Sequence, residues 1–212
     1  VHVLRGCYKG IMVGAGTILA DNPQLTARTE GMIDPVRIIV DGKLSVPLKA
    51  KVFQEEGENI ILTTTASDEE KRKALSDMGV DIIMTDGEEN GSVDLEAAMT
   101  GLALKGIDSI LLEGGATLAA SAFDAGIVDK VRIYTAPMII GGVSAPGLIG
   151  GEGAPTIPKA IRLRDIQTQM TGKDLVIEAY VEKEAKEEKA ESTRPTDVDL
   201  LKREEEPCSQ GS

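Results

Sequence analysis

Short apolar segments alternate with segments of helical periodicity along most of the chain. The apolar segments predict six strands: Gly10–Val13, Val36–Val40, Asn59–Thr63, Val80–Met84, Ser109–Leu112 and Lys130–Ala136. Three of the intervening segments are predicted helices: Asp68–Met78, Asp94–Lys105 and Thr117–Ala125. Apolar strands that are separated by helices are typical of a mostly parallel sheet with both faces covered. The sequence therefore predicts an α/β fold.

The ends of the predicted helices carry their own signals. Glycine follows each helix directly, at Gly79, Gly106 and Gly126, as is common past a helix C-terminus. Ser67 is the predicted N-cap of the first helix because its hydroxyl can accept from a free backbone N–H. The chain begins inside a further predicted helix, Val1–Arg5.

The C-terminal third of the chain has a different pattern. Two runs of alternating residues, Ile161–Thr171 and Asp174–Glu182, meet at Gly172-Lys173 and predict an antiparallel hairpin at the edge of the sheet. Beyond Glu182 the chain is acidic and has few apolar residues, so we expect residues 183–212 to be a disordered tail. Within it, Lys183–Glu191 is at most a frayed helix.

Composition excludes several classes of function. The net charge of -12 argues against nucleic acid or an anionic membrane surface as the main partner. No apolar run approaches the roughly 18–20 residues that a membrane span needs. Because His2 is the only histidine, a Ser–His–Asp triad and a histidine-based metal site are excluded. We expect His2 on a helix surface. Cys7 and Cys208 lie near opposite ends, so we expect reduced thiols, cytoplasmic localisation and a packing role for Cys7.

The segment Val13–Arg28 concentrates groups that suit a polar, anionic small molecule. Gly14 and Gly16 allow close approach of the backbone to a ligand, directly after a buried strand. Thr17 offers a hydroxyl, Asp21 a carboxylate and Arg28 a guanidinium. The Asp-Asn-Pro sequence that begins at Asp21 is equally a turn signature, so a structural role for this carboxylate stays open.

A second candidate site lies where the strand Ser109–Leu112 ends. Gly114 and Gly115 allow a sharp turn, and the N–H groups of the helix that follows would face a phosphate. A tight turn without a ligand is the alternative. Glu113 ends an apolar run, so we expect a half-buried carboxylate that needs a partner. It is either a substrate contact and proton donor or a structural cap.

Four segments in order resemble the pyrimidine reductase family of riboflavin biosynthesis: Val13–Arg28, Pro35–Asp41, Ile110–Leu118 and Ala136–Gly142. The resemblance extends from Val1 to about Glu182. It implies a dihydrofolate-reductase-like, three-layer α/β/α fold with a mostly parallel central sheet and a C-terminal antiparallel hairpin. Because family members carry a strand before this point, we expect a reductase domain over residues 1–182 whose first strand is missing. The resemblance also implies a homodimer.

The function implied by the resemblance is a hydride transfer. NADPH would reduce the ribosyl group of 5-amino-6-(5-phosphoribosylamino)uracil at C1′ and give the ribitylamino product. The non-deaminated diaminopyrimidinone phosphate is an alternative substrate, as is another reducible heterocycle. A non-catalytic nucleotide-binding module is the alternative from another class.

The resemblance also assigns residues to roles. Glu113 and Asp21 would line the reacting centre, and the substrate would contact Arg5, Leu25, Arg28 and Glu113. Arg5 and Arg28 would both hold its 5′-phosphate, with the Leu25 backbone nearby. The residues implied for the cofactor are Thr17, Asp21, Gly42, Gly115, Ala116, Thr117, Leu118, Ala119, Ala120 and Ser121. Thr63–Thr65 could add hydroxyls to the cofactor's ribose or 2′-phosphate, with strand propensity and capping as an equal alternative. Arg37 is predicted to be a structural ion-pair member.

Overall fold

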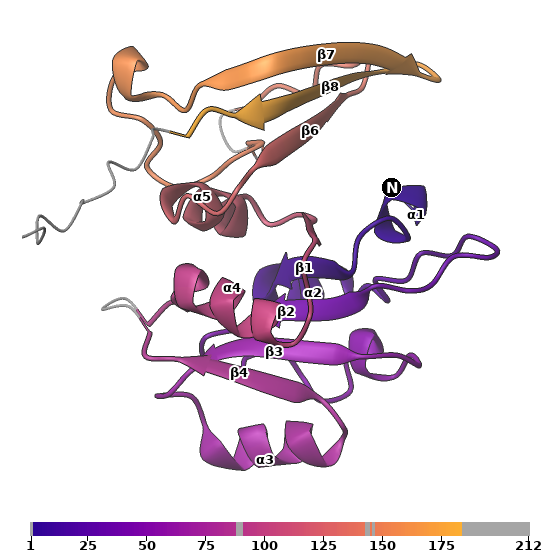
Figure 1. The fold of residues 1–212 in the computed structure, drawn as a ribbon, viewed down its shortest axis with the longest axis vertical. Coiled ribbons are helices and arrows are strands. Elements are labelled where there is room, and N and C mark those ends of the chain that lie inside the picture. Colours follow the sequence, from indigo (N-terminus) through magenta and orange to yellow (C-terminus); the bar gives the residue numbers. More distant parts are fainter. Residues whose placement is uncertain (1, 88–90, 143–144, 146, 184–212) are drawn as a thin grey trace, which may run out of the picture. The chain divides into compact units, whose positions relative to one another are not determined.

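A parallel sheet of five strands forms the centre of the fold. The computed structural model describes residues 2–87, 91–142, 145 and 147–183 (Figure 1). The strand order is β4-β3-β2-β1-β5. These strands are β1 (Gly10–Gly14), β2 (Val36–Val40), β3 (Asn59–Thr64), β4 (Asp81–Thr85) and β5 (Ile110–Leu112). All four strand pairs are parallel, as the alternation of apolar and helical segments predicts.

Helices cover both faces of this sheet and bury a separate apolar cluster on each. On one face, Ile18 of α2 (Ala15–Asp21) and Leu75 of α3 (Glu69–Asp77) pack with Ile39 and Ile61. On the other, α4 (Leu95–Leu104) and α5 (Ala116–Asp124) pack with alternate residues of the same strands. Figure 1 shows α3 and α4 on opposite sides of β3 and β4. The inner strands β1, β2 and β3 are mostly apolar because both of their faces are buried, and Arg37 of β2 is a buried exception.

Each of the three predicted helices ends just before its predicted glycine, but one predicted N-cap is wrong. Asp68, not Ser67, caps α3, and its Oδ1 accepts from the N–H of Lys71 at 2.7 Å. The Ser67 hydroxyl is already engaged, since it donates to the carbonyl of Thr64 at 2.7 Å in the turn after β3. The other short helices are α1 (His2–Arg5) and the 3₁₀ turns η1 (Lys51–Phe53) and η2 (Ile157–Lys159).

The C-terminal strands form a second sheet of their own. The order β6-β8-β7 is antiparallel, with β6 (Lys130–Thr135), β7 (Leu163–Thr171) and β8 (Asp174–Val181). The predicted hairpin is thus present, but β6 pairs with it rather than with the parallel strands. The reason is visible in β6, where charged or aromatic residues alternate with aliphatic ones, a pattern that favours an antiparallel sheet with one polar face.

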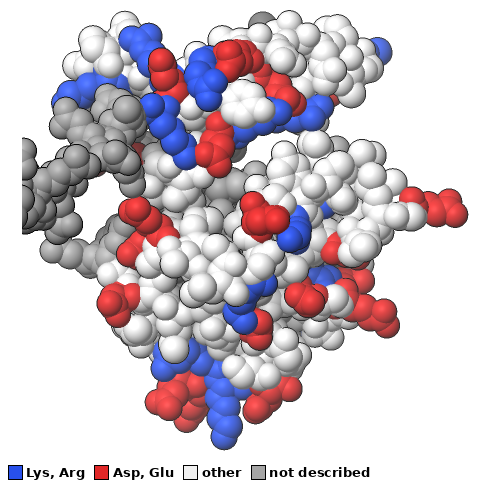
Figure 2. All heavy atoms as spheres, in the orientation of Figure 1, with Lys and Arg blue, Asp and Glu red and all other residues white. Residues whose placement is uncertain are grey.

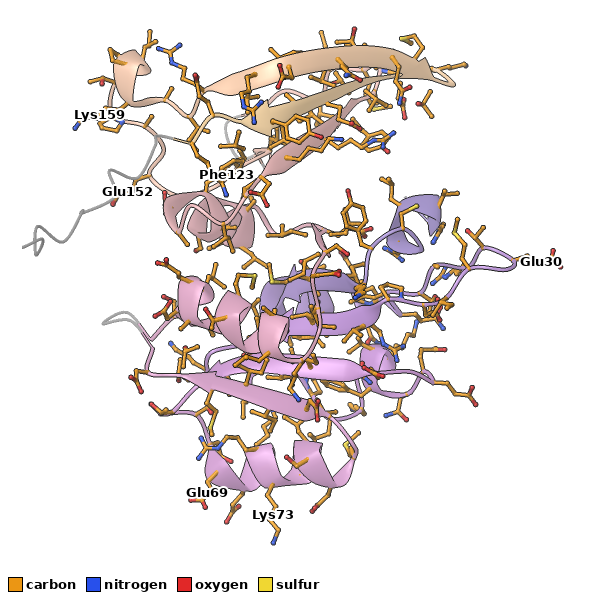
Figure 3. All side chains as sticks on the ribbon, in the orientation of Figure 1. Glu30, Glu69, Lys73, Phe123, Glu152 and Lys159 are labelled. Carbon is orange, nitrogen blue, oxygen red and sulfur yellow. The ribbon has the colours of Figure 1, made fainter. Side chains whose placement is uncertain are left out.

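Charged side chains of both signs cover the outer side of α3. Figure 2 shows acidic and basic residues side by side over this helix, and in Figure 3 Glu69 and Lys73 both project away from the sheet. These two residues are one helical turn apart, a favourable spacing for opposite charges.

In the described residues, no helix has both the length and the apolar character that a membrane crossing requires. Of the tail expected over residues 183–212, residues 184–212 lie outside the described residues.

Candidate active site at the carboxyl end of the parallel sheet

The carboxyl ends of β1 and β5 lie side by side, and the helices that follow them go to opposite faces. Residues Gly10–Met12 pair with Ile110–Leu112, so both strands end at the same edge of the sheet. Ile18 of α2 belongs to one apolar cluster, whereas Leu118 of α5 belongs to the other. Ligands of parallel α/β sheets bind at such a point, where the connections diverge.

A glycine turn and a threonine hydroxyl meet at this point. Gly114 and Gly115 have φ of +75° and +80°, and ideal Cβ atoms on them would lie 3.8 Å and 3.4 Å from Thr17 Oγ1. A side chain at either position would therefore be strained by its backbone conformation, and one at Gly115 would also come into van der Waals contact with the hydroxyl. The structure thus brings together two predicted cofactor contacts that are nearly 100 residues apart in sequence.

Only the first turn of α5 offers free N–H groups. Gly115, the N-cap, supplies no side-chain cap, and the N–H of Ala119 already donates to the Gly115 carbonyl at 2.9 Å. Helix geometry leaves Ala116, Thr117 and Leu118 without intrahelical acceptors. The backbone N–H groups of Ala119, Ala120 and Ser121, which were predicted to contact the cofactor, instead donate to carbonyls within the helix. Gly150 lies against this first turn and donates to the carbonyl of Ala116 at 2.9 Å.

Glu113 and Arg5 form an ion pair at the end of β5. Arg5 Nη2 lies 2.6 Å from Glu113 Oε2, and Arg5 Nε donates to both carboxylate oxygens at 3.0 and 3.2 Å. The side chains are only 12% and 20% exposed, so the predicted half-buried carboxylate has its partner. Arg5 Nη1 donates to the carbonyl of Thr26 at 3.0 Å. Arg5 therefore joins Glu113 to the loop that follows α2.

That loop also carries Leu25 and Arg28, two of the predicted substrate contacts. Both have left-handed backbone, with φ of 61° and 52°, and Leu25 is buried while Arg28 is exposed. Non-glycine residues in this conformation cluster at functional sites. Arg28 Nη2 donates to Gln24 Oε1 at 2.6 Å and Nε to Thr26 Oγ1 at 3.3 Å. Among the described residues, none accepts a hydrogen bond from Arg28 Nη1, which leaves it for a ligand.

Asp21 lies at the end of α2, one helical turn beyond Thr17. Residues four apart share one face of a helix, so the carboxylate follows the hydroxyl along the side of α2. Asp21 is exposed. The next residue, Asn22, is left-handed with φ of 44°, and its side-chain oxygen accepts from the N–H of Lys51 at 2.8 Å. In the predicted turn, Asn22 thus makes the structural contact and Asp21 faces solvent.

The ends of β2 and β3 are closed by internal hydrogen bonds. The Gly42 carbonyl accepts from the hydroxyls of Thr63 and Thr64, at 3.2 and 3.0 Å. The buried Asp41 carboxylate accepts from Ser45 Oγ and from the N–H of Val46. The two buried threonines therefore have a structural partner, and Thr65 is the exposed hydroxyl of the three.

Several sequence interpretations are corrected here. Arg37 belongs to no ion pair among the described residues, because its Nη2 donates to the backbone carbonyls of Glu55 and Glu56 instead. Cys7 is exposed rather than packed, since α1 buries none of its side chains and leaves the following turn at the surface. His2 is exposed, as expected. Within the described parts of the chain, no three His, Cys, Asp or Glu side chains gather as a metal site would require.

Thr26 was missed by sequence reasoning, although it joins the two predicted arginines. Its carbonyl accepts from Arg5 and its hydroxyl from Arg28. A carbonyl contact leaves no mark in the side-chain pattern, so no sequence signal marks Thr26. Gln24 and Glu55 were missed for a similar reason, since each bonds a residue from another segment.

Comparison with known proteins places the chain in a family. The profile of the RibD C-terminal domain matches residues 1–177. A riboflavin biosynthesis protein RibD from Actinobacillus pleuropneumoniae is 38% identical over 182 residues, which cover 85% of this chain and 48% of that protein. The chain thus spans about half the length of the RibD proteins that it matches.

Shorter relatives are matched over most of their length. The 2,5-diamino-6-ribosylamino-4(3H)-pyrimidinone 5′-phosphate reductase of Aquifex aeolicus is 35% identical over 179 residues, covering 84% of this chain and 79% of that protein. The crystal structure of Acinetobacter baumannii RibD has the same fold, with a TM-score of 0.70 at 22% identity over 86% of this chain and 49% of that one. The fold and family predicted from the four motifs are therefore confirmed, and the chain belongs to the RibD C-terminal domain family of riboflavin-biosynthesis reductases.

Proposed function

We propose that this chain reduces a phosphoribosylamino-pyrimidine with NADPH in riboflavin biosynthesis. One observation carries the proposal: at the end of β5, Glu113 lies between the glycine turn against Thr17 and the Arg5–Thr26–Arg28 contacts. A nucleotide-binding element and an anion-binding loop thus flank one carboxylate. The reductase unit is placed at residues 1–182, and 5-amino-6-(5-phosphoribosylamino)uracil is the proposed substrate.

The residues at the glycine turn fit the diphosphate of NADPH. Gly114 and Gly115 leave room beside Thr17, and the first-turn N–H groups of α5 face the same side as the partial positive charge of the helix. When bound, NADPH supplies the hydride. Thr17 and Asp21, on one face of α2, extend from this turn toward the substrate loop. Gly42 and the exposed Thr65, at the ends of neighbouring strands, are proposed for the adenosine side.

Arg28 is proposed to hold the substrate's phosphate, with Leu25 shaping the loop around it. A guanidinium donates in a planar fork that matches phosphate oxygens, and Nη1 of Arg28 has no competing partner among the described residues. Arg5 and Arg28 both bond Thr26, Arg5 at the carbonyl and Arg28 at the hydroxyl. Arg5 also holds the Glu113 carboxylate in a fixed orientation. Substrate recognition and the reacting centre are thereby linked through Arg5.

Glu113 and Asp21 are proposed to move the protons of the reaction. The closed glycosylamine must open before C1′ can accept hydride: the ring oxygen gains a proton and the nitrogen loses one, which leaves a C=N bond. Hydride then adds to C1′ and a proton returns to the nitrogen. Carboxylates beside C1′ suit these transfers. In the ion pair with Arg5, Glu113 is a hydrogen-bond acceptor and is therefore assigned the proton of the nitrogen.

The first test is the oxidation of NADPH in the presence of the phosphoribosylamino-uracil. We expect turnover by the protein, and Glu113→Gln should lower kcat by about 100-fold or more while changing the NADPH Kd less than twofold. Glu69→Gln, an identical change on the outer face of α3, should leave both unchanged. Normal turnover by Glu113→Gln would remove this residue from the reacting centre.

The same assay separates the other candidate functions. The name of the Aquifex aeolicus relative favours the non-deaminated diaminopyrimidinone phosphate as a second candidate substrate. A higher kcat/KM for that compound would reverse our assignment. Binding of NADPH without turnover of either compound would favour a non-catalytic nucleotide-binding module. Turnover of a non-phosphorylated heterocycle alone would point to another reductase activity.

Assembly and location complete the proposal. We place the enzyme in the cytoplasm, with a small-molecule substrate and no nucleic-acid partner, in line with its net charge of -12. A homodimer is proposed from the family resemblance. The exposed apolar residues of the edge strand β7, among them Ile166 and Met170 at 60% and 64% exposure, support an interface there.

A further inference from the structure

Arg37 is a buried arginine whose hydrogen-bonding capacity is only partly used. It lies on β2 between Ile11 and Asn59, its neighbours in register, and is 1% exposed. Its Nε and Nη1 have no hydrogen-bond partner among the described residues. Burying unpaired donors is destabilising, and an apolar residue would fill the same site at lower cost. A purely structural role therefore explains this residue poorly.

The used part of the guanidinium holds one turn. Nη2 donates to the carbonyls of Glu55 and Glu56, at 3.1 and 2.9 Å. The next residue, Gly57, has φ of +117°, and a Cβ on it would lie 3.0 Å from Nη2. A side chain at this position would push against the guanidinium. Arg37 and Gly57 together set the course of the turn that carries the Glu55 side chain.

Two carboxylates lie within the electrostatic reach of Arg37, and both contact the loop after α2. Burial lowers the pKa of Arg37, and the charges of Asp34 and Glu55 oppose that shift. Asp34 Oδ1 accepts from the N–H of Ala27 at 2.7 Å. Glu55 Oε1 accepts from Gln24 Nε2. The buried guanidinium thus interacts electrostatically with both carboxylates that hold the Gln24–Arg28 segment, Glu55 through Gln24 and Asp34 through Ala27.

From Glu55 the contacts lead directly to Arg28. Gln24 uses its amide nitrogen on Glu55 and its amide oxygen on Arg28 Nη2, at 2.6 Å from the latter. A carboxylate accepts only, so it forces the Gln24 nitrogen to face it. The Gln24 oxygen must then face Arg28. Three side chains in series therefore determine the direction in which the Arg28 guanidinium points.

We propose that Arg37 and Glu55 are positioning residues for phosphate recognition: through Gln24 they orient the Arg28 guanidinium toward the phosphate of the substrate. The proposal rests on the proposed function, in which Arg28 binds that phosphate. Arg37 supplies the fixed turn and the positive charge, and Glu55 fixes the orientation of the Gln24 amide. Of the residues in this series, only Arg28 touches the phosphate.

Glu55→Gln tests the series with little change of shape, and Glu56→Gln is its matched control. A glutamine at position 55 can present either its oxygen or its nitrogen to Gln24, so the amide is no longer oriented. Glu56 contributes only its backbone carbonyl to Arg37 among the contacts described. Both variants lose one negative charge from the same turn, in which Glu55 is half-buried and Glu56 exposed, so the loss of net charge is the same in the two.

The readout is the preference for phosphate, measured as the ratio of kcat/KM for the phosphorylated substrate to that for its dephosphorylated form. Arg28→Met should lower this ratio by about 10- to 100-fold, as loss of a charged hydrogen bond predicts. Glu55→Gln and Arg37→Met should each lower it by about 3- to 10-fold, and the double variant by no more than the larger of the two. The Kd of inorganic phosphate should rise by the same factors, and the NADPH Kd should stay constant.

Each failure has a distinct meaning. If Arg28→Met lowers the ratio but Glu55→Gln matches Glu56→Gln, the series does not operate and the proposal is overturned, while phosphate binding by Arg28 stands. If Arg28→Met leaves the ratio intact, the phosphate assignment falls and the positioning role falls with it. Multiplicative losses in the double variant would show that Arg37 and Glu55 act independently, which also contradicts the series.

Discussion

Gly115 is the residue at which a side chain would interfere most directly with the proposed nucleotide site. Its backbone has φ of +80°, and an added Cβ would stand 3.4 Å from the Thr17 hydroxyl. Gly115→Ala should therefore raise the NADPH Kd about tenfold: the left-handed conformation costs alanine about 1–2 kcal/mol, so the free turn would relax to another conformation, which binding would have to reverse. A fluorescence titration with NADPH measures the change.

The matched control for this substitution is Gly106→Ala. Gly106, just after α4, has the same φ of +80°, and a Cβ there would meet nothing within 4 Å. This change should lower the free energy of unfolding by about 1–2 kcal/mol for the same backbone reason and leave the NADPH Kd as it is. Equal NADPH affinities for Gly115→Ala and the unchanged protein would contradict a close approach of the cofactor to this turn.

At the level of elements, helix α4 carries one leucine that packs in the core and another that is exposed to solvent. Leu102 is 0% exposed and belongs to the cluster beneath the helix, whereas Leu104 is 86% exposed. Leu102→Ala should lower the free energy of unfolding by about 2–5 kcal/mol, and Leu104→Ala by less than about 0.5 kcal/mol. Urea denaturation of both variants checks this. Similar losses in the two would mean that α4 packs on another face.

The antiparallel sheet carries an ion pair that should respond to pH. A hydrogen bond from Lys130 lowers the pKa of Glu178 below its ordinary 4.5, with Arg132, 3.3 Å away, adding to the effect. The same bond raises the pKa of Lys130 above 10.5. The lowered carboxylate pKa stabilises the fold above about pH 4.5, and that contribution is lost as pH falls through the folded-state pKa. The raised lysine pKa contributes below about pH 10.5 and is lost as pH rises through its folded-state value.

Glu178→Gln tests this pair. Because both side chains are partly exposed, at 36% for Lys130 and 26% for Glu178, solvent screens the interaction. We expect the variant to lose about 0.2–1 kcal/mol of unfolding free energy at neutral pH and almost none in acid. Urea curves at the two pH values give the difference, and a loss that is the same at both would exclude an electrostatic origin.

At the level of the whole molecule, the proposed dimer has a direct test. Light scattering on the eluting protein should give twice the mass of one chain, and Ile166→Glu should shift it to the single-chain mass. A charge in an apolar interface is costly because it loses its water without gaining a partner. Lys173→Glu, in the β7–β8 turn, is the control and should leave the dimer intact. One-chain mass across the concentration range would contradict the dimer.

Local patterns in the sequence determined the elements and the chemical groups of this protein. Apolar runs and helical periodicity depend on neighbouring residues, so the parallel strands and the three long helices were predicted. Residue type singled out Thr17 and Arg28 as candidate ligand contacts, and Glu113 was predicted to be half-buried. The partner of β6 was not predicted, because pairing joins Lys130–Thr135 to Leu175–Tyr180 of β8, a distant segment of the chain.

Only the tertiary structure decided which of those groups meet. Glu113 finds its partner in Arg5, 108 positions earlier. Thr26 joins Arg5 to Arg28, since its carbonyl accepts from Arg5 and its hydroxyl from Arg28. Arg37 was predicted to be a structural ion-pair member, but it is buried and donates to the backbone carbonyl of Glu55. Residue type and spacing fix what a side chain can do, whereas its neighbours follow from how distant segments pack against one sheet.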